Sequence, residues 1–285
     1  YAARRRLDAR ADRLAAGTMD GGGAGAWRLT GPAGWALGAV AAAFSAFVAV
    51  LYLTIVRCAF VRGMGWDAPF TLENFRHLVD FDLTPLLRGM AYGALAAVAG
   101  CAVGAAVAYF CHRRRTPGSG LLSFAAAMPY MLPGTCLGLG YILSFNSGPL
   151  KLTGTGAVIV AVLATKQLTV SVDAFSNALA QVPRDLDRAA ADLGAGELSR
   201  YVGVLWPNLR EAVAVSLLNG FSSAMMAYGA VVFLVSPSTK TGIVQLFDAL
   251  SGGRYGYAAA IAVVLIAITL AVDLVSWHLA GRGRR

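Results

Sequence analysis

The chain has 285 residues, of which 57% are hydrophobic and 14% are charged, and its mean hydropathy is +0.62. Soluble domains contain about 45–50% apolar and about 25% charged residues, so these values exclude an ordinary soluble domain and indicate several membrane crossings. The net charge of +9 would suit a nucleic-acid partner. Basic residues also gather on the cytoplasmic side of membrane proteins, and we favour that explanation and expect no nucleic-acid partner.

The N-terminal region is rich in Arg, Ala and Gly and contains the run GGGAG at residues 21–25. We expect a cytoplasmic arm or linker over residues 1–33, because Gly-rich segments form flexible connections. A membrane domain over residues 34–280 follows, and a short cytoplasmic tail covers residues 281–285. The sequence begins with Tyr1 and not with an initiator Met, so we expect that it starts inside a longer chain or after processing.

Six apolar runs are long enough to cross a bilayer, since a transmembrane helix needs about 20 mostly apolar residues. They cover residues 34–56, 90–111, 121–145, 156–178, 212–235 and 257–279. The predicted fold class is therefore an all-α polytopic membrane protein with six transmembrane helices.

The basic residues predict the orientation of these six spans. Sixteen of the 24 Lys and Arg residues lie in the arm, in the loops after the second and fourth spans, and in the tail. Seven lie in the remaining loops and helix ends, and Lys166 lies inside a span. This asymmetry predicts that both termini are cytoplasmic.

The third span contains two prolines, Pro129 and Pro133, together with several glycines. Proline inside a transmembrane helix frees backbone carbonyls, which is tolerated where neighbouring helices or a cavity satisfy them. The pattern predicts a kinked helix that lines a pathway. Glycines four residues apart let helix backbones approach closely, and two such pairs occur: Gly100 with Gly104 and Gly134 with Gly138.

Three ionisable residues lie inside spans, where charge is costly and usually faces a bundle interior or a wet cavity. Lys166 and Asp173 are seven residues apart in the fourth span and share one helix face. We treat them as candidates for lining a translocation pathway, with a place in the bundle interior fitting them equally well. We expect Asp273 in the sixth span to pair or snorkel near the cytoplasmic end.

No enzymatic motif stands out in the sequence. It has no GxxxxGK[ST] phosphate loop, no GxSxG elbow and no HExxH helix, and its four Cys and three His residues form no ligand cluster. We therefore expect no catalytic residue, no metal site and no cofactor in this chain.

A polar, amphipathic segment over residues 181–207 separates the fourth and fifth spans. Its apolar residues fall at helical spacing in two stripes, divided by Gly194 and Gly196. The stripes are Val182, Leu186, Ala189, Ala190 and Leu193, then Leu198, Tyr201, Val202 and Leu205. The spacing predicts two short helices joined by a turn in which Gly194 has positive φ. Periodicity favours equally a helix pair resting on the inner leaflet and one that seats in a groove of a partner.

This segment resembles the EAA loop of permease subunits of binding-protein-dependent ABC importers. The family pattern is Glu-Ala-Ala, three residues, Gly, nine residues, an aliphatic residue, one residue, then Leu-Pro. Five residues are in register: Ala189, Ala190, Gly194, Val204 and Pro207. Arg188 stands in place of the Glu, directly after Asp187, and Trp206 stands in place of the Leu.

The resemblance implies a type I importer permease of the inner membrane that forms half of a translocation pore and works by alternating access. It implies ATP-binding cassette subunits that hold ATP and Mg, a second permease half and an extracytoplasmic substrate-binding protein as partners. The loop would be the coupling helix that docks on the ATP-binding subunit, and the absent Glu affects any single salt bridge there. The residues implied in coupling are Asp187, Arg188, Ala189, Ala190, Asp192, Leu193, Gly194, Ala195 and Pro207.

Residues 129–155 and 230–259 are similar to the second half of ferric-iron importer permeases, a group that also includes polyamine and 2-aminoethylphosphonate permeases. Some of these iron permeases fuse two six-span halves, and residues 1–33 would fit a linker between halves. Ferric iron is therefore the expected cargo, with the two organic cargoes as alternatives. The rival functional class is a secondary transporter or channel without an ATPase, which has no use for a docking loop at this position.

Overall fold

The computed structural model describes residues 32–63, 68–81, 83–114, 116–147, 151–200, 203 and 206–282. The chain divides into two compact units, Tyr1–Thr54 and Ile55–Arg285. Most of the predicted arm over residues 1–33 and of the tail over residues 281–285 lies outside the described residues.

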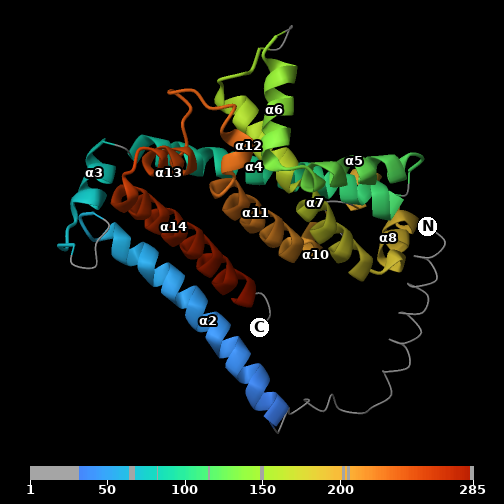
Figure 1. Cartoon of the computed structure of the whole chain (residues 1–285). Coiled ribbons are helices and arrows are strands. Elements are labelled where there is room, and N and C mark those ends of the chain that lie inside the picture. The colour runs from blue at the N-terminus through green and yellow to red at the C-terminus, as the bar shows by residue number, and fades with distance from the viewer. Residues whose placement is uncertain are drawn as a thin grey trace. The chain divides into compact units, whose positions relative to one another are not determined.

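The described residues form helices, apart from a single antiparallel bridge between Val61 and Phe70 (Figure 1). The helices are α2 (Pro32–Ala59), α3 (Glu73–Phe81), α4 (Leu83–Ala108), the π-helix η1 (Tyr109–Arg114), α5 (Ser119–Met131), α6 (Gly134–Phe145), α7 (Gly156–Gln181), α8 (Arg184–Asp192), α9 (Glu197–Arg200), α10 (Trp206–Asn208), α11 (Arg210–Met225), α12 (Tyr228–Val231), α13 (Gly242–Ser251) and α14 (Tyr255–Arg282). The all-α prediction is therefore confirmed for the part of the chain that is described.

Four of the six predicted spans correspond to continuous helices that are long and apolar enough to cross a membrane. They are Gly34–Ala59 in α2, Leu83–Arg114 in α4 and η1, Gly156–Gln181 in α7, and Tyr255–Val275 in α14. Helix α2, most of which belongs to the first unit, is apolar on all sides, as expected for a helix that crosses a membrane.

The third predicted span, residues 121–145, is two helices and not one kinked helix. Helices α5 and α6 meet at 112°, as in a broken span or a re-entrant loop. Pro133 restricts the residue before it to extended conformations, and Leu132 adopts φ −85° and ψ 138°. Pro129 stays inside the last turn of α5. The break therefore lies at Pro133, and the expectation of a single kinked helix was wrong.

The fifth predicted span, residues 212–235, is also divided. Helix α11 ends at Met225, and a short helix α12 follows after Met226 and Ala227. Helix α12 lies against α6 at a very close approach. A Cβ added at Gly138 would lie 2.6 Å from the carbonyl oxygen of Ala230. The predicted small-residue pair Gly134 and Gly138 thus brings two backbones together.

Helices α4, α7 and α11 pack against one another at the centre of the second unit. The Gln167 side chain of α7 is only 3% exposed, and its Nε2 donates to the carbonyl oxygen of Ala96 over 2.7 Å. Gly100 of α4 and Gly220 of α11 leave the space that this side chain occupies, since a Cβ at either position would clash with Gln167. One turn further along α7, Ser171 and Ser216 share a hydrogen bond of 2.7 Å.

Three clusters of buried residues hold these helices. One lies where α4, η1, α5, α7 and α11 meet, and it contains Phe175 and Leu209. A second joins α4, α6, α7 and α12 around Ile159 and Leu234. The third joins α3, α4, α13 and α14 around Leu78 and Ile261. The first cluster matters for function, because the segment between α7 and α11 starts and ends in it.

Candidate coupling loop and pathway residues

The amphipathic segment forms a helix, a tight turn and a second, short helix at the end of α7 (Figure 1). Helix α8 ends at Asp192, and Gly194 has φ +83°. The amide of Ala195 donates to the carbonyl oxygen of Ala190 over 3.0 Å, which is the six-to-one bond of a Schellman motif. The predicted positive φ at Gly194 is confirmed, and it reverses the chain between α8 and α9.

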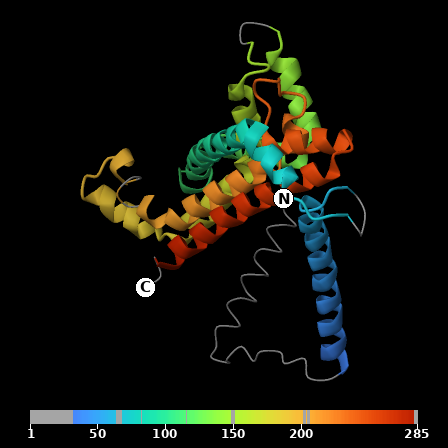
Figure 2. The same ribbon diagram turned by 90° about the vertical axis from the view of Figure 1, so that its left-hand side faces the viewer.

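Three of the five residues in the first apolar stripe are exposed, and they lie on α8 or directly after it. Leu193 is 89% exposed and Leu186 is 50% exposed, and Ala189 is exposed as well. Figure 2 shows this segment, in yellow, extending beyond the neighbouring helices of its unit. Apolar residues exposed together on a short helix are suited to contact with a partner protein or with the membrane.

Both ends of the segment are anchored in the same buried cluster. Val182 follows α7 and is buried, and Leu209 precedes α11 and is 1% exposed. The same cluster contains Phe175 and Leu179 of α7 and Ala212 of α11. A displacement of α8 would therefore act on three packed helices, α4, α7 and α11, through a common set of contacts.

An arginine of the preceding loop holds the junction between α7 and α8. Arg113 donates from Nη1 to the carbonyl oxygen of Val182 over 3.0 Å and from Nη2 to that of Pro183 over 3.3 Å. The neighbouring His112 shares a hydrogen bond of 3.0 Å between its Nδ1 and the Oγ of Ser176 in α7. Both residues belong to η1, and π-helical turns occur often at functional sites.

No pattern in the sequence linked Arg113 to the loop. Arg113 was only one of the basic residues that indicate the cytoplasmic side of the membrane. The two carbonyls that it binds lie about 70 residues further along the chain. A sequence pattern in the loop itself carries no signal for such a contact. The only available hint is the position of a basic residue at the cytoplasmic end of the second span.

The remaining predicted coupling residues fall in the expected elements. Asp187, Arg188, Ala189, Ala190 and Asp192 lie in α8, Leu193 to Ala195 form the turn, and Pro207 lies in α10. The side chains of Asp187, Arg188 and Leu198 lie outside the described set, as do Tyr201, Val202, Val204 and Leu205. No side chain of the second predicted stripe is therefore described.

The candidate pathway residues lie on α7 and on the broken pair α5–α6. Lys166 is partly buried and Asp173 is exposed. Between them on α7, Thr169 donates from Oγ1 to the carbonyl oxygen of Ala126 in α5 over 2.8 Å. One turn earlier, the hydroxyls of Thr165 and Tyr141 of α6 are 2.6 Å apart. The face of α7 that carries the candidates therefore borders both halves of the break at Pro133, with Pro129 buried in α5.

Asp273 is exposed and has a partner, in line with the expectation that it pairs or snorkels. Ser222 of α11 donates from Oγ to its Oδ1 over 3.3 Å. Over the described residues, no group of three or more His, Cys, Asp or Glu side chains could hold a metal ion.

Comparison with known proteins places the chain in a family. Residues 83–285 match the model of the binding-protein-dependent transport system inner membrane component. The ferric transport system permease protein FbpB of Actinobacillus pleuropneumoniae is 30% identical over 229 residues, which are 79% of this chain and 33% of that protein. The putative 2-aminoethylphosphonate transport system permease protein PhnV of Salmonella paratyphi A is 32% identical over 152 residues, 52% of this chain and 56% of that protein.

A solved structure shares the fold. A bacterial ABC transporter involved in the import of the acidic polysaccharide alginate matches with a TM-score of 0.71 at 14% identity, covering 87% of this chain and 96% of the matched chain. The chain spans about a third of the length of the ferric permease that it matches. The family match covers most of the chain and includes the loop, so this chain belongs to the inner membrane components of binding-protein-dependent transport systems.

Proposed function

We propose that this chain is a permease that forms half of the translocation pore of an ATP-driven importer and is coupled to ATP-binding subunits through residues 181–207. The observation that carries the proposal is the set of exposed apolar residues on and directly after α8, in a segment anchored in the buried cluster shared by α4, α7 and α11. ATP binding would close two ATP-binding subunits, which would move α8 and turn the cavity towards a loaded binding protein. ATP and Mg are expected on those separate subunits, and a second permease half completes the pore.

We propose a six-span arrangement with both termini in the cytoplasm, in which each broken pair, α5–α6 and α11–α12, counts as one crossing. The support is the basic asymmetry, the bent pair α5–α6, and the short distance along the chain between α11 and α12. With this topology Ser147 and Gly252 lie outside. Cysteine variants at these two positions should react with a membrane-impermeant thiol reagent added from outside. Reaction of either one from the cytoplasmic side alone would contradict the topology.

Ferric iron, bare or as a small chelate, is the cargo that we propose. The support is the similarity to a ferric permease over 79% of the chain. A 2-aminoethylphosphonate permease matches over a shorter part, so that compound is the second candidate, and a polyamine is the third. The absence of a ligand cluster among the described residues is compatible with iron if the external binding protein selects the cargo and the pore only passes it.

Uptake by the complete transporter tests both the mechanism and the cargo. The complex with its own ATP-binding subunits and binding protein, reconstituted in liposomes, should accumulate labelled iron only when ATP is present. Labelled 2-aminoethylphosphonate and a polyamine serve as competing cargoes in parallel samples. Accumulation of an organic cargo without iron would overturn the iron assignment alone. Accumulation by the permease without its ATP-binding subunits would favour a secondary transporter and overturn the importer mechanism.

A further inference from the structure

A cavity of about 520 Å³ lies in the second unit between α3 and the N-terminal end of α14. Cavities of this size lie within the range of small-molecule sites. The side chains that bear on its chemistry are Arg62, Glu73, Asn74, His77, Arg254 and Tyr257. We refer to it as the α3–α14 pocket. Its lining includes none of the loop or pathway residues described above, so the proposed transport function gives it no role.

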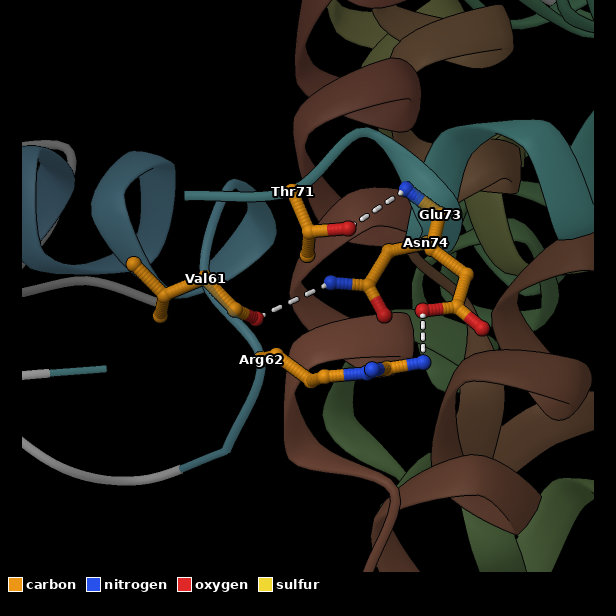
Figure 3. A network of polar contacts seen from close by, with 5 residues as sticks. All are labelled: Val61, Arg62, Thr71, Glu73 and Asn74. Carbon is orange, nitrogen blue, oxygen red and sulfur yellow. Dashed lines mark hydrogen bonds and ion pairs between the residues drawn. The ribbon is translucent and has the colours of Figure 1, made fainter. Parts of the chain in front are cut away.

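The walls of the pocket are held by polar contacts to the backbone (Figure 3). Asn74 donates from Nδ2 to the carbonyl oxygens of Ala59 and Val61, over 3.0 and 3.2 Å. Thr71 accepts a bond from the backbone amide of Glu73 over 3.1 Å and so caps α3. Gly256 lets α14 approach, because a Cβ there would lie 2.9 Å from Asn74 Nδ2. The pocket is therefore formed in advance of any ligand.

Its charges are two guanidinium groups and one carboxylate. Arg62 Nη2 lies 2.6 Å from Glu73 Oε2, and the Arg254 guanidinium lies over the Tyr257 ring, 5.3 Å from its centroid. The Tyr257 hydroxyl already accepts a hydrogen bond from Gln245, and its ring contacts both Arg254 and His77. The Arg254 guanidinium is therefore the group on this wall that can bind a ligand. Guanidinium groups bind phosphate with well-directed hydrogen bonds. The excess of positive charge calls for an oxyanion, and the carboxylate beside it suits an ammonium group.

The pocket lies where apolar spans end. The span in α2 ends at Ala59, and the span in α14 begins at Tyr255, the residue after Arg254. Around it, α3 and the segment before it expose large apolar side chains, among them Phe70, Val79 and Phe81, the last of which is 76% exposed. Apolar spans end at the level of lipid headgroups, and aromatic and basic residues gather there. The pocket is therefore expected at the level of the phosphate and amine groups of the lipid headgroups.

We propose that the α3–α14 pocket binds a ligand with an ammonium and a phosphate group, supplied by the headgroup of phosphatidylethanolamine in the adjoining leaflet. Arg62 and Arg254 bind the phosphate, and Glu73 accepts hydrogen bonds from the ammonium. The lipid tails lie along the exposed side chains of α3. This site goes beyond the proposed transport function and requires only that α14 enters the bilayer at Tyr255.

Retention of lipid by the purified full chain tests the proposal. The protein is equilibrated in detergent with equal amounts of phosphatidylethanolamine and phosphatidylglycerol, and bound lipid is counted by native mass spectrometry. We expect the unmodified chain to retain phosphatidylethanolamine at least fivefold more than the R62Q/R254Q variant does. Glu73→Gln should lower the preference for phosphatidylethanolamine over the anionic lipid, because it removes the acceptor for the ammonium.

The matched control is Arg76→Gln, which removes a positive charge from α3 outside the pocket, where Arg76 pairs with Asp80. It should retain lipid like the unmodified chain. Soluble phosphoethanolamine that binds without any retained lipid would assign the same chemistry to a free zwitterion and overturn the lipid source. Equal retention by R62Q/R254Q and the unmodified chain would overturn the site. If the same variant lost only its association with the binding protein, the pocket would be a protein contact instead.

Discussion

Replacing Gly194 with valine should weaken coupling about tenfold while the chain still inserts into the membrane. Gly194 has φ +83°, and no atom lies within 4 Å of a Cβ built there, so the cost comes from the backbone and not from a clash. A β-branched residue in the left-handed region is a genuine outlier, and such strain costs about 1–3 kcal/mol. The turn between α8 and α9 would populate its docking geometry less, and the apparent affinity for the ATP-binding subunit falls by the same fraction.

The expected result is a loss of about tenfold in the ATPase activity that the loaded binding protein stimulates, measured on the reconstituted complex. Gly196→Val is the matched control, because Gly196 lies two residues away, has no positive φ and also faces open space. It should retain most of the stimulation. Equal activity of the Gly194 and Gly196 variants would contradict a role of the turn and leave the loop as a helix pair resting on the leaflet.

The continuous spans were predictable from the sequence because run length and hydropathy alone decide them. The helices α4, α7 and α14 follow their apolar runs closely. The size of the bend at Pro133 and the existence of the break after Met225 were not predictable from the sequence. A proline shows that a helix is disturbed, but the 112° angle depends on what the two halves pack against. The second break has no proline at all, and it lies beside the contact of α12 with Gly138 of α6.

The candidate site likewise combines local features that were predictable with contacts between distant segments that were not. The turn at Gly194 and the stripe of α8 are local features, since glycine placement and helical spacing determine them. The outward direction of Leu186 and Leu193 could not be read from the spacing, which fits a leaflet or a partner equally well. Contacts between distant segments, such as Gln167 with Ala96 or Arg113 with Val182, leave no trace in local periodicity.

Arg113→Ala should loosen the junction between α7 and α8 and weaken coupling without preventing assembly. The side chain binds two successive carbonyl oxygens, those of Val182 and Pro183. Hydrogen bonds to a charged group contribute about 1.5–3 kcal/mol, and the bond to Pro183 is exposed, so we expect the lower end of that range. Amides of residues 184–193 should then exchange their hydrogens faster in the chain alone in nanodiscs, and stimulated ATPase activity of the complex should fall severalfold.

Two further variants separate the geometry of this contact from its charge. Arg113→Lys retains the charge, but an ammonium is a compact charge without the planar fork that reaches two carbonyls, so we expect an intermediate exchange rate. Arg210→Ala removes the same charge from the first residue of α11, where the side chain is exposed, and should leave exchange at residues 184–193 almost unchanged. If Arg113→Ala and Arg210→Ala accelerated exchange equally, the effect would come from net charge. Coupling would then pass from α8 into the packed helices through the buried residues Val182 and Leu209 alone.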